Sequence, residues 1–143
     1  MTTKISKYFT LEEMIFSQTA ARQGIDNSPR TGILSAIAFT AFEMDKVREL
    51  LGHPVIVSSG YRSPELNAFI GGSPTSSHMN GEAVDFTCPG FGTVREVFDA
   101  IRKSDLEFDQ LTVEFGRWVH MGFGYKNRRQ VLSYNRNGYR EVV

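Results

Sequence analysis

Residues 76–85 read SSHMNGEAVD, and this stretch decides the fold prediction because it joins a turn to the start of a strand. His78 and Asp85 are seven positions apart, a spacing that would separate them by about 10.5 Å along a straight helix. The Asn-Gly pair at 80–81 instead favours a turn. Beyond it, a strand would place Asp85 on the face opposite Val84 and Phe86, which suit a core. The stretch therefore predicts a loop that carries His78 and a strand that carries Asp85.

Residues 118–123, WVHMGF, alternate in the same way. Period two places His120 on one face with Trp118 and Gly122, and turns the other side chains toward a core (Val119, Met121 and Phe123). Two strands can then present Asp85 and His120 on a common face. With His78 they make two imidazoles and a carboxylate, the ligand set of a catalytic zinc ion whose fourth position is kept for water or substrate.

Each of these residues also has a simpler interpretation. A His and an Asp seven positions apart occur often by chance, and a single His on a strand is more often a hydrogen-bonded residue than a ligand. The metal site is favoured because both segments are predicted to be strands that present Asp85 and His120 on a common face. The third histidine, His53, lies in LGHP at 51–54, and we expect it to be an exposed turn residue.

Length and composition are typical of one domain spanning residues 1–143. A chain of this size buries about 68% of its unfolded surface and needs no structural metal, so a metal can be catalytic. The single cysteine, Cys88, excludes an internal disulfide, and we expect it to be buried at the end of a strand. Residues 1–9 are polar, unlike a signal peptide, and no run is long enough to span a bilayer. We therefore expect synthesis in the cytoplasm without a signal peptide, and no membrane insertion.

The charges are balanced in number but not in distribution. The chain has 16 basic and 16 acidic residues, yet residues 117–143 hold six basic side chains against the single acidic Glu141. This bias suits an anionic polymer such as a cell wall or a nucleic acid, although a solvated basic surface is the commoner reason for it.

Apolar periodicity and cap residues predict the order of elements. Helices are expected from a capping box at Thr10 toward Ser17, and over residues 33–51, 63–70 and 93–103. Strands are expected over 54–58, which we predict to be central, and over 83–87, 110–115, 118–123 and 130–134. Helices first and strands later predict an α+β fold, with a small, mainly antiparallel sheet that carries the zinc ligands and is flanked by helices.

Three separated motifs carry a resemblance to a known family: SGYRS at 59–63, SHMNGEAVD at 77–85 and WVH at 118–120. The chain resembles the zinc D-alanyl-D-alanine metallopeptidases, which include D,D-carboxypeptidases and peptidoglycan-cleaving phage endolysins. YFTLEE at 8–13, SQTAAR at 17–22 and NRRQVL at 127–132 resemble the small phage-type members. The resemblance implies the fold of lysostaphin-type peptidases and the hedgehog signalling domain, with one catalytic Zn²⁺ on His78, Asp85 and His120.

Such a peptidase also needs a base. In many relatives an acidic residue stands three positions before the last histidine, but here that position is Arg117. Glu114 shares a strand face with His120, although six residues span about 20 Å of straight strand. Gly116 permits a hairpin at 115–117 that would bring Glu114 alongside. Glu114 is therefore the candidate base, and a structural carboxylate is the alternative.

Three further residues are candidates for substrate contacts. The guanidinium of Arg62 can bind a substrate carboxylate or stabilise charge on the carbonyl oxygen, and the resemblance places it in the cleft. An ordinary surface arginine is the alternative, but its position between a strand and a helix start favours the cleft. Ser77 can hydrogen-bond substrate or orient His78, or act as a local cap. Trp118 can form the floor of the cleft or serve packing alone.

The sequence thus predicts a zinc peptidase that acts on the stem peptides of peptidoglycan as a monomer, without binding nucleic acid. It leaves open the bond that is cut and the choice between carboxypeptidase and endopeptidase. One alternative is a non-catalytic zinc-containing cell-wall binding module, suggested by Arg117 and the hedgehog domain. A second is a structural or nucleic-acid-associated protein that uses the basic segment at 117–143. We expect action at the bacterial cell wall, after phage-mediated release.

Overall fold

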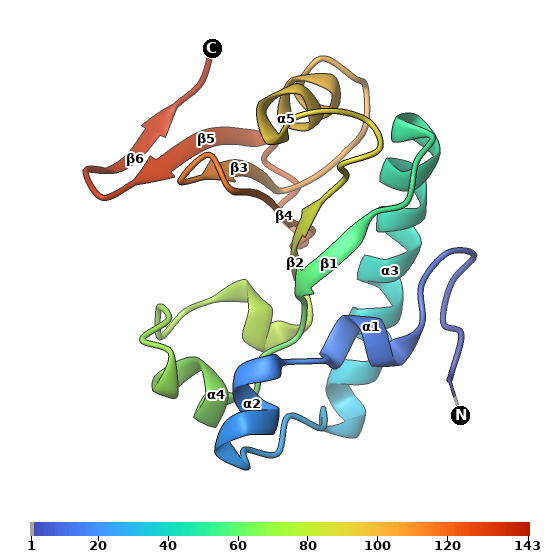
Figure 1. The fold of residues 1–143 in the computed structure, drawn as a ribbon, viewed down its shortest axis with the longest axis vertical. Coiled ribbons are helices and arrows are strands. Elements are labelled where there is room, and N and C mark those ends of the chain that lie inside the picture. The colour runs from blue at the N-terminus through green and yellow to red at the C-terminus, as the bar shows by residue number, and fades with distance from the viewer. Residues whose placement is uncertain (1) are drawn as a thin grey trace.

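The computed structural model describes residues 2–143 and has the α+β fold that the sequence predicts (Figure 1). Its centre is a six-stranded sheet in the order β1-β2-β4-β3-β5-β6. The strands in chain order are β1 (Ile56–Ser59), β2 (Ala83–Thr87), β3 (Gln110–Glu114), β4 (Trp118–Gly122), β5 (Gln130–Asn135) and β6 (Gly138–Glu141). All neighbours pair antiparallel except β3 and β5, which are parallel.

Three helices begin directly after the predicted cap residues Thr10, Ser63 and Thr93, whereas the long helix predicted from residue 33 begins two residues earlier. They are α1 (Leu11–Ile15), α2 (Gln18–Gln23), α3 (Thr31–Leu51), α4 (Pro64–Phe69), the short 3₁₀ helix η1 (Ser77–Asn80) and α5 (Val94–Arg102). Thr10 and Thr93 form capping boxes with Glu13 and Glu96, so each pair satisfies backbone N–H groups that the first helical turn leaves free. Ser63 caps α4, whose first residue is Pro64.

The core lies on one face of the sheet, under α3 and α5 (Figure 1). The alternation predicted for β2 and β4 is confirmed, because Val84, Phe86, Val119 and Met121 are fully buried in that core. Asp85 and His120 therefore point to the opposite face of the sheet. The same packing buries Cys88 directly after β2, as predicted.

The N-terminal segment is fixed to α3 by a buried carboxylate. Asp45 is 6% exposed and accepts hydrogen bonds from the Ser6 hydroxyl and the backbone N–H groups of Lys7 and Tyr8. This anchor holds the chain as it enters α1, which in turn contacts β1.

One sequence prediction of structure was wrong, and two elements were not predicted. The strand near 54–58 is not central: β1 is an edge strand, with Ile56 53% exposed, because its second edge meets no further strand of the sheet. The first helix runs toward Ser17 as predicted and ends at Ile15, and Ser17 caps α2, which was not predicted. Strand β6 was also not foreseen. Within residues 2–143, no helix is both long and apolar enough to cross a lipid bilayer.

Candidate metal centre

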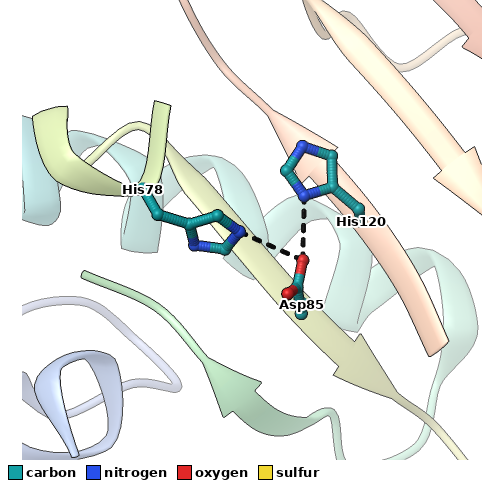
Figure 2. Close-up of side chains that lie close together, drawn as sticks. All are labelled: His78, Asp85 and His120. Carbon is teal, nitrogen blue, oxygen red and sulfur yellow. Dashed lines mark hydrogen bonds and ion pairs between the residues drawn. The ribbon is translucent and has the colours of Figure 1, made fainter. Parts of the chain in front are cut away.

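His78, Asp85 and His120 meet on the open face of the sheet (Figure 2). One carboxylate oxygen, Oδ1 of Asp85, lies 3.2 Å from Nε2 of His78 and 2.8 Å from Nδ1 of His120. The two imidazole rings are 5.2 Å apart between centroids. All three side chains are largely removed from solvent, with His78 2% and His120 8% exposed.

The backbone of a neighbouring loop orients His78. Its Nδ1 lies 2.7 Å from the carbonyl oxygen of Gly60, and because a carbonyl only accepts, Nδ1 must carry the proton. That bond leaves the Nε2 lone pair facing Asp85. Gly60 itself packs so closely on the backbone of Met14 that a Cβ atom there would overlap the Met14 carbonyl. Only glycine allows this approach, so Gly60 belongs to the support of the site.

Strand pairing positions the other two ligands. Asp85 of β2 is the direct partner of His120 of β4, so both side chains leave the sheet on the same face at the spacing of paired residues. His78 lies in η1, whose C-terminal cap is Gly81, just before β2. The predicted arrangement of a turn followed by a strand is therefore confirmed.

The electrostatics of the three groups reflect their mutual contacts. Burial opposes ionisation of Asp85, but the adjacent His78 and His120 outweigh it and hold the pKa of this carboxyl well below its ordinary value. Burial lowers the pKa of His78, since desolvation exceeds the attraction of Asp85. For His120 burial acts in the same direction, but Asp85 and Glu114 prevail and raise the pKa. The centre thus combines an ionised carboxylate with a neutral His78.

These residues fit a metal ion. Two imidazole nitrogens and a carboxylate oxygen lie within 4.8 Å of one another and converge on one point. The hydrogen bond from His78 to Gly60 is the kind of outer contact that fixes the tautomer of a histidine ligand. Three protein donors leave a coordination position open for water or substrate.

Glu114 lies beside this group because the chain turns back at residues 115–117. Strands β3 and β4 form a hairpin in which Glu114 pairs with Trp118, and Oε1 of Glu114 is 3.8 Å from Nδ1 of His120. The hairpin predicted from Gly116 is confirmed, with Gly116 at a φ of 65°. Burial, followed by the charge of Asp85, raises the pKa of Glu114. Arg117, three positions before His120, is exposed in the hairpin turn.

Arg62 places a cation near both carboxylates. It follows β1, and its Nη2 donates to the hydroxyl of Ser76 at 3.2 Å. Burial lowers the pKa of its guanidinium, while Asp85 and Glu114 act in the opposite direction. Its buried Nε has no hydrogen-bond acceptor among residues 2–143, so part of the guanidinium is free to bind another group.

A cleft of about 540 Å³ surrounds the centre. Its walls come from the loop between α4 and η1 on one side and from β3 to β6 on the other, and they include every candidate residue named from the sequence (Arg62, Ser77, His78, Asp85, Glu114, Trp118 and His120). Tyr134 and Tyr139 also line it, together with Asp109 and Arg128, which are joined by an ion pair of 2.9 Å. His53 is remote and exposed, as expected.

Sequence reasoning missed three contributors to the site. The carbonyl of Gly60 is a backbone group, and only its place in the SGYRS motif pointed to it. Tyr134 and Tyr139 reach the cleft through the pairing of β5 with β3 and of β6 with β5. No local pattern signals those pairings, because they join segments across the sheet.

Comparison with known families supports the assignment of His78, Asp85 and His120 to a metal centre. A family model described as Peptidase M15 matches residues 7–122, which include all three converging ligands. No curated protein matches the chain significantly. The match covers most of the chain, and the His-Asp-His group lies inside it, so the chain belongs to the peptidase M15 family of metallopeptidases.

Proposed function

We propose that this chain is a zinc-dependent peptidase that hydrolyses peptide bonds of bacterial peptidoglycan. The observation that carries the proposal is the convergence of His78, Asp85 and His120, with Glu114 beside them in one cleft. Membership of the peptidase M15 family supports the reaction class. The donor set supports zinc, because two imidazoles, one carboxylate and an open position are typical of catalytic zinc sites.

The residues around the ligands suit peptide hydrolysis. Zinc, when bound, would polarise the scissile carbonyl and lower the pKa of a bound water toward about 7. Glu114 is positioned to accept the proton of that water and return it to the leaving amine. Arg62, with an unused donor, is suited to bind a substrate carboxylate or the oxygen on which charge develops. Ser77 and Trp118 would contact the substrate on either side.

A binding module without catalysis is less well supported. That alternative rested on the absence of an acid at Arg117. Glu114 supplies a carboxylate from the other strand of the hairpin, 3.8 Å from His120. We therefore expect catalytic hydrolysis of either the D-Ala–D-Ala or the L-Ala–D-Glu bond. We further expect the enzyme to be a monomer that acts at the cell wall after release from the cytoplasm.

Metal analysis and fragment analysis together test the proposal. The purified chain should hold about one zinc per molecule, lose activity on chelation and regain it with zinc. His78→Ala and Asp85→Ala should remain folded by circular dichroism but be inactive. Mass spectrometry of digested peptidoglycan would identify the bond and whether ends or crosslinks are cut. Full activity of the metal-free chain would contradict the proposal.

A further inference from the structure

A continuous group of aromatic side chains borders the cleft beside the metal centre. Trp118, Tyr134 and Tyr139 form what we call the aromatic wall, and the ring of Phe115 contacts Trp118 and Tyr134. The ring centroids are 5.6 Å apart for Phe115 and Trp118, 5.3 Å for Phe115 and Tyr134, and 4.4 Å for Tyr134 and Tyr139. These spacings are those of interacting aromatic rings, so the group is held as a unit.

The register of the sheet turns the wall toward the reacting centre. Glu114 pairs with Trp118 on one side and Tyr134 on the other, and Tyr134 pairs with Tyr139. Paired residues share a face, so Trp118, Glu114, Tyr134 and Tyr139 form one row across β4, β3, β5 and β6, with Glu114 between the tryptophan and the two tyrosines, on the face that carries the ligands. All three line the cleft. Partial burial and then the Glu114 carboxylate raise the pKa of Tyr139, which agrees with a phenol directed to this side.

Packing of the core does not account for this row of rings. Tyr139 is 60% exposed and Phe115 is 47% exposed, and β6 has no fully buried residue. Phe115 also adopts a φ of 55°, a conformation that is strained for a bulky residue. Tyr134 and Tyr139 lie beyond residues 7–122, the part that matches the family model. Exposed apolar surface that borders a cleft is typical of a ligand-binding groove.

We propose that the aromatic wall binds a pyranose ring of the glycan to which the substrate peptide is attached. The proposal rests on the proposed function, since peptidoglycan joins sugar and peptide covalently. The C–H groups on one face of a pyranose carry partial positive charge and pack on the negative face of an aromatic ring. The hydroxyl groups around that sugar can then bond to water or to the polar ends of the two tyrosines.

The composition of the wall favours a sugar over an apolar side chain. Two tyrosines and a tryptophan combine an apolar face with a polar tip, and Tyr139 remains 60% exposed where it borders the cleft. An apolar side chain would gain most from an enclosed aliphatic pocket, where it loses contact with water completely. A sugar, which stays partly hydrated, suits an open aromatic surface.

Intrinsic fluorescence provides a direct test, because Trp118 is the only tryptophan of the chain and belongs to the wall. We would titrate the zinc-loaded protein with a peptidoglycan tetrasaccharide from which the stem peptides have been removed. Binding should change the Trp118 emission. Tyr139→Ala should weaken binding about fivefold or more, whereas Tyr139→Phe, which keeps the ring, should bind like the wild type. Tyr125→Ala, at a 90% exposed aromatic outside the cleft, is the matched control.

Parallel assays separate this proposal from the proposed function. With a muropeptide and the same peptide without sugar as substrates, the wild type should prefer the muropeptide, and Tyr139→Ala should reduce that preference. Cleavage of both substrates without glycan binding would contradict the role of the aromatic wall in sugar binding but would agree with the proposed peptidase activity. Glycan binding without any cleavage would support the wall and contradict the peptidase. If Tyr139→Phe and Tyr139→Ala weakened glycan binding equally, the effect would come from the hydroxyl group, and sugar packing on the ring would be contradicted.

Discussion

At the scale of single residues, the clearest consequence of the structure is the position of Glu114, the proposed general base. Arg117 is close to His120 in sequence but lies exposed in the hairpin turn. Glu114 is more distant from His120 in sequence, but it pairs with Trp118 across the hairpin, and its carboxylate lies 3.8 Å from His120. Proximity in the sheet therefore favours Glu114 over the position that sequence spacing alone would suggest.

Replacing Glu114 by glutamine should separate catalysis from metal binding. Glu114→Gln keeps the shape of the side chain but cannot accept the proton, so we expect activity to fall by about 10²–10⁴-fold. Zinc content should be unchanged, because the converging group consists of the other three residues. Steady-state hydrolysis and elemental analysis measure the two quantities.

Arg117→Gln is the control for this prediction. The side chain is exposed in the same hairpin, so its replacement should leave hydrolysis close to that of the wild type. A Glu114→Gln protein with wild-type turnover would show that Glu114 is structural.

At the scale of elements, the N-terminal segment and α3 behave as one unit because Asp45 joins them. Its carboxylate accepts three hydrogen bonds from residues 6–8 while being only 6% exposed. Two of the donors are backbone N–H groups, and these would be left without acceptors if the carboxylate were removed.

Asp45→Ala should therefore lower the free energy of unfolding by about 2–4 kcal/mol. Glu49→Ala is a matched control on the same helix, because it removes only the 3.4 Å ion pair with Lys7, in which both side chains are more than half exposed. We expect about 0.5 kcal/mol or less for that change. Denaturant unfolding measures both, and equal effects would contradict the assigned role of Asp45.

At the scale of the whole molecule, the cleft is assembled from segments that are far apart in the chain. Asp109 shows how they are held, because it accepts hydrogen bonds from the backbone N–H and the guanidinium of Arg128 and so joins the start of β3 to the segment before β5. The hydrogen bonds from Arg128 outweigh burial and lower the pKa of Asp109. Part of the basic segment is thus used within the fold, since Arg129 also bonds to the backbone of Ser104 and Leu106.

The lowered pKa of Asp109 predicts a loss of stability in acid. The folded state binds this proton less readily than the unfolded chain, whose pKa is near 3.8, so the stabilisation is complete above that value and is lost as pH falls through the lower folded value. In the chelated protein, Asp109→Asn should reduce stability by about 1 kcal/mol at neutral pH. The difference from the wild type should shrink as the medium becomes acidic.

Urea unfolding at a series of pH values measures this difference. Asp105→Asn, at an exposed aspartate in the preceding loop, is the control and should follow the wild type at every pH. A difference between Asp109→Asn and the wild type that stays constant down to strong acid would contradict the assigned role.

Local patterns determined the elements that have strong signals of their own. Capping boxes at Thr10 and Thr93 and the alternation in β2 and β4 each depend on neighbours in the chain, and the structure agrees with them. The edge position of β1 was not predictable, because a β-branched run has the same composition at an edge as in the middle of a sheet. Strand β6 is mostly exposed and has no apolar alternation by which it could be recognised.

The sequence by itself determined the identity of the three converging ligands and the face on which two of them lie, because alternation along a strand is a local property of the backbone. Only the tertiary structure decided which groups surround them. The Gly60 carbonyl, the Glu114 carboxylate and the tyrosines of β5 and β6 reach the centre through a close backbone contact, a hairpin and strand pairing. These placements depend on contacts between distant segments, and such contacts form only when the whole core packs.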